Sequence, residues 1–195
     1  MNIGIYGGTF NPPHLGHLVL AQSAIDAFGL DRVLMVPAFR SPFKLSSESL
    51  PAETRAEMVA LAVSGNSRLA CEYFEVLRGG ISFTVDTLRH VRQTQPEASL
   101  FLLMGADTFN EFHLWKDPEA IAGLATLAVA RRPGSTIEAA GRADAPAFRE
   151  FTMPLLDISS TDIRRRVREG RSIDYLVPWT VQVFIESHGL YRESD

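Results

Sequence analysis

The stretch NIGIYGGTFNPPHLGHL, residues 2–18, decides how the chain begins to fold. Its first part, residues 2–6, is short and mainly apolar, which predicts a buried strand. Two glycines and two prolines follow in a loop, and a helical pattern then runs over residues 14–28. Gly29 ends that pattern at the position after a helix where glycine is favoured. The chain therefore opens with a strand, a glycine-rich loop and a helix.

The rest of the chain continues this alternation of strands and helices. We predict strands at residues 32–36, 68–73, 99–104, 126–130 and 151–156, and helices at 53–63, 83–93, shortly after residue 107, and from about 160 and 178 onward. Uninterrupted apolar strands between helices indicate a parallel sheet that is covered on both faces. We therefore predict an α/β fold, a Rossmann-like doubly wound parallel sheet with helices on both faces, in a single domain over residues 1–195.

Composition narrows the function classes. The net charge of −4 argues against a general nucleic-acid binder, which would need a basic face. Cys71 has no second cysteine to pair with, which suits a reducing cytoplasm. No secretory signal is visible, and no apolar run approaches the ~20 residues that a membrane span needs. We expect a cytoplasmic protein with no membrane or nucleic-acid partner, and Arg165, Arg166 and Arg168 are candidates for solvent contacts or for subunit contacts in a homo-oligomer.

The first loop has the features of a phosphate site. Gly7 and Gly8 lack Cβ atoms, so a ligand can approach their backbone closely. The helix start behind the loop is electropositive and offers N–H donors. His14 and His17 are three residues apart, which places them on one face of that helix. Their rings could donate hydrogen bonds to phosphate oxygens and stabilise charge that grows during phosphoryl chemistry.

Other interpretations of this loop fit less well. A P-loop needs Gly-Lys followed by Ser or Thr, which does not follow Gly8, and the dinucleotide pattern Gly-x-Gly-x-x-Gly is also missing. A His-x-x-His pair could bind zinc, but no cysteine or histidine pair elsewhere completes a tetrahedral site. A purely structural role of the two histidines at the helix start stays open at this point.

A second phosphate-binding pattern lies near the carboxyl end, in residues 158–164, ISSTDIR. Ser159 and Asp162 have the spacing of a capping box, which alone would explain both residues. It does not explain three consecutive hydroxyl residues followed by Arg164 on the next turn. Hydroxyls, helix N–H groups and a guanidinium fork together form a phosphate-binding device. In a doubly wound sheet, ligands lie beyond the carboxyl ends of the strands, so two such devices at one crevice suggest a polyphosphate.

Together these two motifs resemble those of the nucleotidyltransferase superfamily that carries a His-x-x-His element and an Ile-Ser-Ser-Thr-x-Ile-Arg motif. Within it, the chain most resembles the bacterial nicotinate-nucleotide adenylyltransferases. Further matching segments are residues 79–88 (GGISFTVDTL), 105–107 (GAD), Trp115, 132–134 (RPG), 176–178 (LVP) and 189–191 (GLY). The resemblance therefore covers nearly the whole chain.

The resemblance implies a reaction and a set of site residues. The reaction is adenylyl transfer from ATP to nicotinate mononucleotide, which gives nicotinate adenine dinucleotide and pyrophosphate for NAD biosynthesis. The implied catalytic residues are His14, His17 and Arg164. The implied ATP-binding residues are Gly7, Gly8, Thr9, Phe10, Lys44, Gly105, Asp107, Ser159, Ser160 and Thr161. The residues implied for nicotinate mononucleotide are Thr84, Trp115 and Arg132. Mg²⁺ would accompany ATP, held by phosphates and water rather than by protein ligands, and the helical part from about residue 158 to 195 would complete the site.

Two departures from the family pattern and several rival functions stay open. Phe43 stands where the family commonly has histidine, and Asn11 where aspartate is common, so the ATP contacts of these positions are in question. The rival enzymes are a variant that prefers nicotinamide mononucleotide and a phosphopantetheine adenylyltransferase. A nucleotide-sensing module without turnover is the non-enzymatic rival. Such a module would be expected to have a broken His-x-x-His element or to lack the arginine after the serines, and both are intact here. Trp115 could also be a simple core residue, since large aromatic side chains are usually buried.

Overall fold

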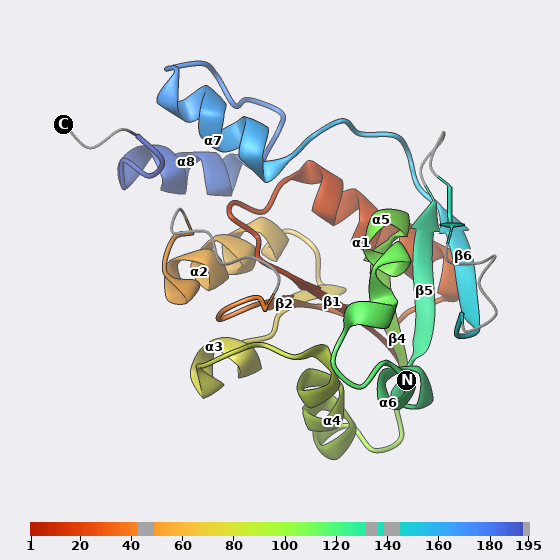
Figure 1. The fold of residues 1–195 in the computed structure, drawn as a ribbon. Helices are drawn as coiled ribbons and strands as arrows, with labels where there is room; N and C mark the ends of the chain where they lie inside the picture. Colours follow the sequence, from red (N-terminus) through yellow and green to blue (C-terminus); the bar gives the residue numbers. More distant parts are fainter. Residues whose placement is uncertain (43–48, 132–135, 139–144, 193–195) are drawn as a thin grey trace.

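The fold is built on one parallel sheet. The computed structural model describes residues 1–42, 49–131, 136–138 and 145–192. In these ranges the sheet has six strands in the order β3-β2-β1-β4-β5-β6, and every neighbouring pair is parallel (Figure 1). The strands are β1 (Asn2–Gly8), β2 (Arg32–Pro37), β3 (Leu69–Cys71), β4 (Ser99–Gly105), β5 (Thr126–Arg131) and β6 (Phe148–Thr152). The order reverses between β1 and β4, which confirms the predicted doubly wound sheet and places its switch point there.

The helices mostly match the sequence-based prediction. They are α1 (Leu15–Phe28), α2 (Ala52–Val63), α3 (Phe74–Arg78), α4 (Thr84–Thr94), α5 (Ala106–Asn110), the 3₁₀ helix η1 (Phe112–Leu114), α6 (Pro118–Leu124), α7 (Ser160–Arg168) and α8 (Trp179–Ser187). The sequence analysis missed α3, η1 and α6. These have seven residues or fewer, which is too short for a 3.6-residue period to stand out.

The last strand was placed too late in the sequence. It spans Phe148–Thr152 rather than residues 151–156. This strand lies at the edge of the sheet, where Arg149 and Glu150 are exposed. Oε1 of Glu150 forms an ion pair with Nε of Arg131 of β5 at 2.6 Å. An edge strand can carry such charges, so a search for an apolar run finds only its end.

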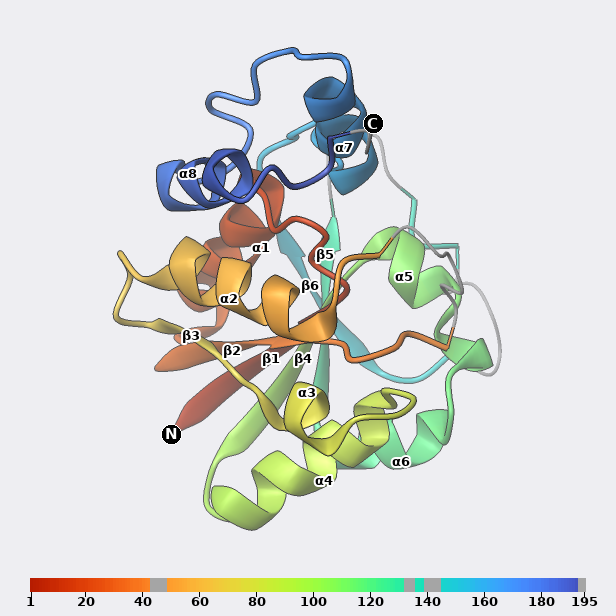
Figure 2. The ribbon, with the colours of Figure 1, turned by 90° about the vertical axis from the view of Figure 1, so that its left-hand side faces the viewer.

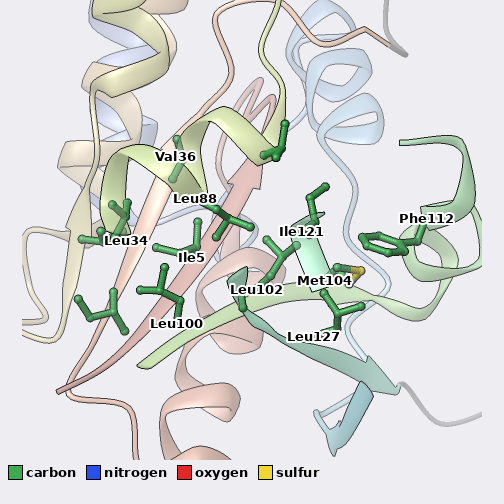
Figure 3. Packing of buried hydrophobic residues seen from close by; sticks show 14 of the residues in the cluster. Ile5, Leu34, Val36, Leu88, Leu100, Leu102, Met104, Phe112, Ile121 and Leu127 are labelled. Atoms are coloured by element: carbon green, nitrogen blue, oxygen red, sulfur yellow. The ribbon is translucent and has the colours of Figure 1, made fainter. Parts of the chain in front are cut away.

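Two apolar layers cover the sheet because its side chains alternate. Along β4, the side chains of Leu100, Leu102 and Met104 join one cluster, while Phe101 and Leu103 join the other. Figure 3 shows the first cluster, which includes Leu88 of α4, Phe112 of η1 and Ile121 of α6. The second cluster packs against the buried residues of α1 and part of α2. Figure 2 shows α1 and α2 on one side of the sheet and α3, α4 and α6 on the other.

The carboxyl-terminal helices α7 and α8 form a third cluster with α2. Met58 of α2 packs there with Ile163 of α7 and with Val181 and Ile185 of α8. Both views place α7 and α8 together, with α8 alongside α2 (Figures 1 and 2), and Thr180 of α8 donates its hydroxyl to the carbonyl of Leu61 in the last turn of α2. This packing brings the carboxyl-terminal segment, from Ser160 onward, back to the loop that follows β1. Among the described residues, no helix has the length and apolar character needed to pass through a bilayer.

Candidate active site

The phosphate loop, which we define as residues 9–12, follows β1 at the carboxyl edge of the sheet. A Cβ atom added to Gly8 would lie 2.9 Å from Cζ of Phe10, so only glycine lets this buried ring fold back onto the strand end. Phe10 itself has a φ of 49°, in the left-handed region that few non-glycine residues adopt. A Cβ on Gly7 would meet nothing within 4 Å. Gly8 therefore allows the close approach of the Phe10 ring, and Gly7 leaves the backbone open to a ligand.

The two histidines of the His-x-x-His element lie against each other. Their ring centroids are 3.6 Å apart, and the ring planes differ by 27°. Nδ1 of His17 accepts a hydrogen bond from the backbone N–H of His14 at 3.1 Å. A neutral His17 therefore carries its proton on Nε2, since one ring nitrogen accepts and the other donates. In this tautomer, Nε2–H is the hydrogen-bond donor of the ring.

Gly16 lies between the two histidines and makes their stacking feasible. A Cβ atom at this position would come within 3.0 Å of Nδ1 of His14 and 3.1 Å of its Cε1. It would also lie 4.0 Å from the carbonyl oxygen of Ile158, just before α7. The first turn of α1 is therefore bare on the side where the His14 ring and the start of α7 approach it.

The helix start of α1 offers fewer free donors than the sequence analysis expected. The N–H of Leu15, the first residue of α1, donates to the carbonyl of Leu176 at 3.0 Å. This donor is therefore used to hold the carboxyl-terminal segment and is not part of a phosphate cradle. The electropositive helix end remains, because the macrodipole is the sum of the aligned peptide dipoles along the whole of α1.

The start of α7 meets the phosphate loop directly. Ser160 Oγ donates to the carbonyl of Pro12 at 2.8 Å, and Nη1 of Arg164 donates to the carbonyl of Asn11 at 2.9 Å. The partners of these two bonds are 148 and 153 residues apart in sequence. The two motifs that the sequence analysis singled out therefore lie side by side, at one loop.

The capping of α7 is only partly as predicted. Ser159 Oγ accepts the N–H of Asp162 at 3.1 Å, which confirms Ser159 as the N-cap. The carboxylate of Asp162 pairs with Arg165, so it serves the solvent face of the helix rather than a reciprocal capping box. Thr161 and Ser159 are exposed, and Ser160 is half-buried. The exposed hydroxyl of Ser159 can accept from the N–H of Asp162 and still donate to a ligand.

Two residues that the sequence analysis did not assign to the site also hold the phosphate loop. Arg55 of α2 donates from Nη1 to the carbonyl of Thr9 at 2.6 Å, and Tyr191 donates its hydroxyl to Oδ1 of Asn11 at 2.7 Å. A signal for Arg55 existed, because it shares the buried stripe of α2 with Ala52, Ala56 and Val59, where an arginine is out of place.

Burial sets the charge states of these two groups. Burial lowers the pKa of Arg55 from its ordinary value, while Tyr191 and Glu53 oppose the shift. Burial raises the pKa of Tyr191, and the charges of Arg164 and Arg55 oppose that shift. A phenol with a raised pKa stays protonated at neutral pH, so Tyr191 is a constant donor to Asn11. Oδ1 of Asn11 thus serves as an acceptor for Tyr191, a role that aspartate could fill equally well.

The residues implied for the adenosine half lie at the neighbouring strand. Gly105 ends β4, which pairs with β1, and it directly precedes α5. A Cβ at Gly105 would meet nothing within 4 Å, and Asp107 in the first turn of α5 is exposed. Both residues are therefore at the carboxyl edge of the sheet beside the phosphate loop, accessible to a ligand at the switch point.

The residues implied for the acceptor come together on the α4 side. Thr84 is the first residue of α4, and Trp115 follows η1. The two segments are linked by Lys116, whose ammonium lies 4.3 Å from the ring centroid of Phe83. Trp115 is half-buried and packs against Phe112, with ring centroids 5.4 Å apart. Trp115 is thus packed against the core on one side and accessible on the other.

Lys44 and Arg132, which the resemblance implies as ligands, lie outside the described residues, as does Phe43. Within the described ranges, no three side chains of His, Cys, Asp or Glu are grouped so that they could hold a metal ion. The roles of all the implied site residues stay predictions.

Comparisons with known proteins point in one direction. The model of the Cytidylyltransferase-like family matches residues 5–166. A Thermus thermophilus protein named "Probable nicotinate-nucleotide adenylyltransferase" is 46% identical over 192 residues, which cover 98% of this chain and 100% of that protein. A Salinibacter ruber protein of the same name is 38% identical over 195 residues and 100% of both chains. The structure of Plasmodium falciparum nicotinic acid mononucleotide adenylyltransferase complexed with NaAD aligns over 97% of both chains with a TM-score of 0.80. Its 18% identity supports the fold alone.

Proposed function

Since this chain belongs to the cytidylyltransferase-like family and shares 38% to 46% of its sequence with full-length nicotinate-nucleotide adenylyltransferases, we propose that it joins ATP and nicotinate mononucleotide into nicotinate adenine dinucleotide, with release of pyrophosphate. One structural observation supports this most directly. The starts of α1 and α7 converge on residues 9–12, through Ser160 and Arg164, and so bring both phosphate motifs to a single place.

The reaction needs no nucleophile from the protein. A phosphate oxygen of nicotinate mononucleotide attacks the α-phosphorus of ATP, and a new O–P bond forms there. The bond from the α-phosphorus to the oxygen that bridges it to the β-phosphorus breaks, and pyrophosphate leaves with those electrons. Catalysis then depends on positioning and on stabilising the charge that spreads over the phosphate oxygens.

The described residues are suited to that task. Nε2–H of His17 is a donor held in a defined tautomer by the backbone of His14. Nη1 of Arg164 donates to the carbonyl of Asn11, and the guanidinium fork has further N–H groups that suit phosphate oxygens. We expect His14, His17 and Arg164 to stabilise the transferring phosphate, and Ser159, Ser160 and Thr161 to contact the other phosphates. Gly105 and Asp107 are expected at the ribose.

The start of α4 suits a ring that carries a carboxylate. The start of α4 at Thr84 presents N–H groups and the positive end of an eleven-residue helix, which favour an anion. Trp115 directly precedes Lys116, whose ammonium lies over the ring of Phe83, the residue before Thr84. We therefore propose that Trp115 stacks on the pyridine and that the backbone at Thr84 reads its carboxylate. An amide in place of the carboxylate would lose the interaction with the helix end.

Magnesium is expected to enter with ATP. The donors at the phosphate loop are imidazole, hydroxyl and guanidinium groups, which bind phosphate rather than Mg²⁺. This donor set fits an ion that keeps mostly phosphate and water ligands, and when bound it would neutralise charge on the phosphates. The reducing cytoplasm, which the single cysteine also suits, is the compartment in which we place the reaction.

Pyrophosphate release tests the proposal. The purified protein is given ATP and Mg²⁺ with nicotinate mononucleotide, nicotinamide mononucleotide or phosphopantetheine, and pyrophosphate is measured by a coupled assay. We expect the highest kcat/KM with nicotinate mononucleotide. Higher values with nicotinamide mononucleotide would contradict the carboxylate role of Thr84, and activity with phosphopantetheine alone would assign the chain to a different reaction. ATP binding without pyrophosphate release from any acceptor would favour a nucleotide sensor.

A further inference from the structure

Arg55 is a buried cation whose donors are all directed at backbone carbonyls. Its side chain is 2% exposed. Besides the bond to Thr9, Nη2 donates to the carbonyls of Ala38 at 2.6 Å and Phe39 at 3.0 Å, and Nε donates to Leu50 at 3.0 Å. One guanidinium thus joins the loop after β1 to the loop after β2. The rigid planar fork of arginine suits this, whereas the point charge of lysine does not.

The charge of Arg55 lacks a direct counter-ion in the described part of the chain. None of the ion pairs described there includes Arg55. Carbonyl oxygens satisfy its N–H groups, and Glu53 acts on its charge electrostatically, but no carboxylate of the described residues forms an ion pair with it, and a buried charge without such a partner is costly. An anion bound at the phosphate loop would offset part of this cost. Arg55 therefore favours phosphate binding in addition to its contacts with the loop.

The bonds to Arg55 also orient the phosphate loop. In a planar trans peptide, the C=O and the following N–H point in opposite directions. Because the carbonyl of Thr9 points to Arg55, the N–H of Phe10 points away from α2. Arg164 and Ser160 hold two further carbonyls of the loop, those of Asn11 and Pro12. Three of the four carbonyls in residues 9–12 are thus fastened by side chains from α2 and α7.

The same anchoring reaches the acceptor side. The N–H of Phe39 donates to Oγ of Ser82 at 2.9 Å, and the N–H of Ser82 donates to the carbonyl of Arg40 at 2.9 Å. Ser82 lies two residues before Thr84, at the start of α4. A continuous path of hydrogen bonds therefore runs from the phosphate loop through Arg55 and residues 38–40 to the segment expected to read the pyridine carboxylate.

We propose that Arg55 and Tyr191 are positioning residues for adenylyl transfer, which hold the phosphate loop in the geometry that binds the ATP phosphates. Arg55 acts on the backbone of the loop, and Tyr191 acts on it through the side chain of Asn11. Neither residue needs to touch a substrate. This inference rests on the proposed function, because it assigns the loop to the phosphates of ATP.

Two variants test it, with a matched control. Arg55→Lys keeps the charge but loses the fork, and Tyr191→Phe removes a single hydroxyl from a buried ring. Tyr175→Phe makes the same change on a tyrosine that is 89% exposed. Each protein is checked for folding by circular dichroism. Binding of a non-hydrolysable ATP analogue with Mg²⁺ is measured by calorimetry, and kcat and KM are measured for ATP at saturating nicotinate mononucleotide.

We expect Tyr191→Phe to weaken binding of the analogue by about three-fold to ten-fold, as the loss of one hydrogen bond to the loop predicts. Arg55→Lys should lower kcat/KM for ATP by at least about ten-fold, because several anchoring bonds are lost together. In both variants, KM for nicotinate mononucleotide should change less than KM for ATP. Tyr175→Phe should stay within about two-fold of the wild type in every measurement.

The outcomes separate a positioning role from a purely structural one. A variant that merely misfolds in part would lose kcat in proportion to its folded fraction, with the affinity of the folded fraction for the analogue unchanged, and that result overturns the proposal. If Arg55→Lys does not fold, the Tyr191→Phe variant tests the proposal alone. A wild-type affinity for the analogue together with a wild-type kcat/KM for ATP in Tyr191→Phe would then refute the proposal. If the wild type itself releases no pyrophosphate, the proposed function fails, while the calorimetric comparison still decides the inference.

Discussion

Replacing Gly16 by alanine should lower activity without lowering stability. The added Cβ would lie 3.0 Å from Nδ1 and 3.1 Å from Cε1 of His14. An unstrained contact needs about 3.5 Å, so the overlap is about 0.5 Å. The backbone of α1 is rigid, whereas the His14 side chain can rotate. The ring should therefore move away and lose its stacking on His17, whose centroid now lies at 3.6 Å.

The magnitude follows from the size of this shift. A misplacement of about 1 Å can cost about 10²-fold in rate, so a shift of about half that size should cost about ten-fold, or about 1.4 kcal/mol in the activation barrier. Stability responds differently. Alanine is better than glycine inside a helix by up to about 1 kcal/mol, which offsets the strain of the displaced ring. We therefore expect a Tm within about 4 °C of the wild type.

The assay is steady-state pyrophosphate release with ATP and nicotinate mononucleotide, combined with thermal unfolding. Gly123→Ala is the matched control, because Gly123 lies in α6 and an added Cβ there would meet nothing within 4 Å. It should gain a little stability and keep full activity. Full activity of Gly16→Ala would refute the argument that the position of the His14 ring matters. A large loss of stability in that variant would show that the backbone, and not the ring, takes up the strain.

Three further predictions follow from the site and its surroundings. His17→Ala should lower kcat by about 10²-fold to 10³-fold with the fold retained, because a donor to the transferring phosphate is lost; an unchanged kcat would contradict this role. Trp115→Ala should raise KM for nicotinate mononucleotide by about five-fold to ten-fold and leave KM for ATP nearly unchanged, as expected for loss of ring stacking; a defect confined to ATP would count against stacking. Burial raises the pKa of Cys71 to about 11, so only a small fraction is thiolate at pH 7. Its alkylation should be slow there and accelerate by about ten-fold per pH unit up to the pKa, and rapid alkylation at pH 7 with a plateau below pH 9 would contradict the raised value.

Much of the fold could be predicted because the relevant signals are local. The buried strands β1, β2, β4 and β5 are short apolar runs, and the long helices α1 and α2 carry a 3.6-residue period, so most of their bounds were found within two residues. The edge strand β6 and the short helix α3 lack such signals, since one is half-exposed and the other has five residues. In the site, the spacing of His14 and His17 indicated that the two rings meet, but the reason differs from the predicted one: His14 is the extended N-cap of α1 and His17 its third residue, so they meet as partners across the helix start rather than as neighbours on a helix face.

The sequence by itself determined the order of strands and helices, the two phosphate motifs and the family resemblance, since each is written in residues close together along the chain. Only the tertiary structure decided that Arg164, Ser160, Arg55 and Tyr191 all hold residues 9–12. The hydroxyl of Tyr191 meets Asn11 across 180 residues, and Nη1 of Arg55 meets Thr9 across 46. Such bonds depend on how α2, α7 and the carboxyl-terminal segment pack together, and no local periodicity specifies which donor will reach which carbonyl.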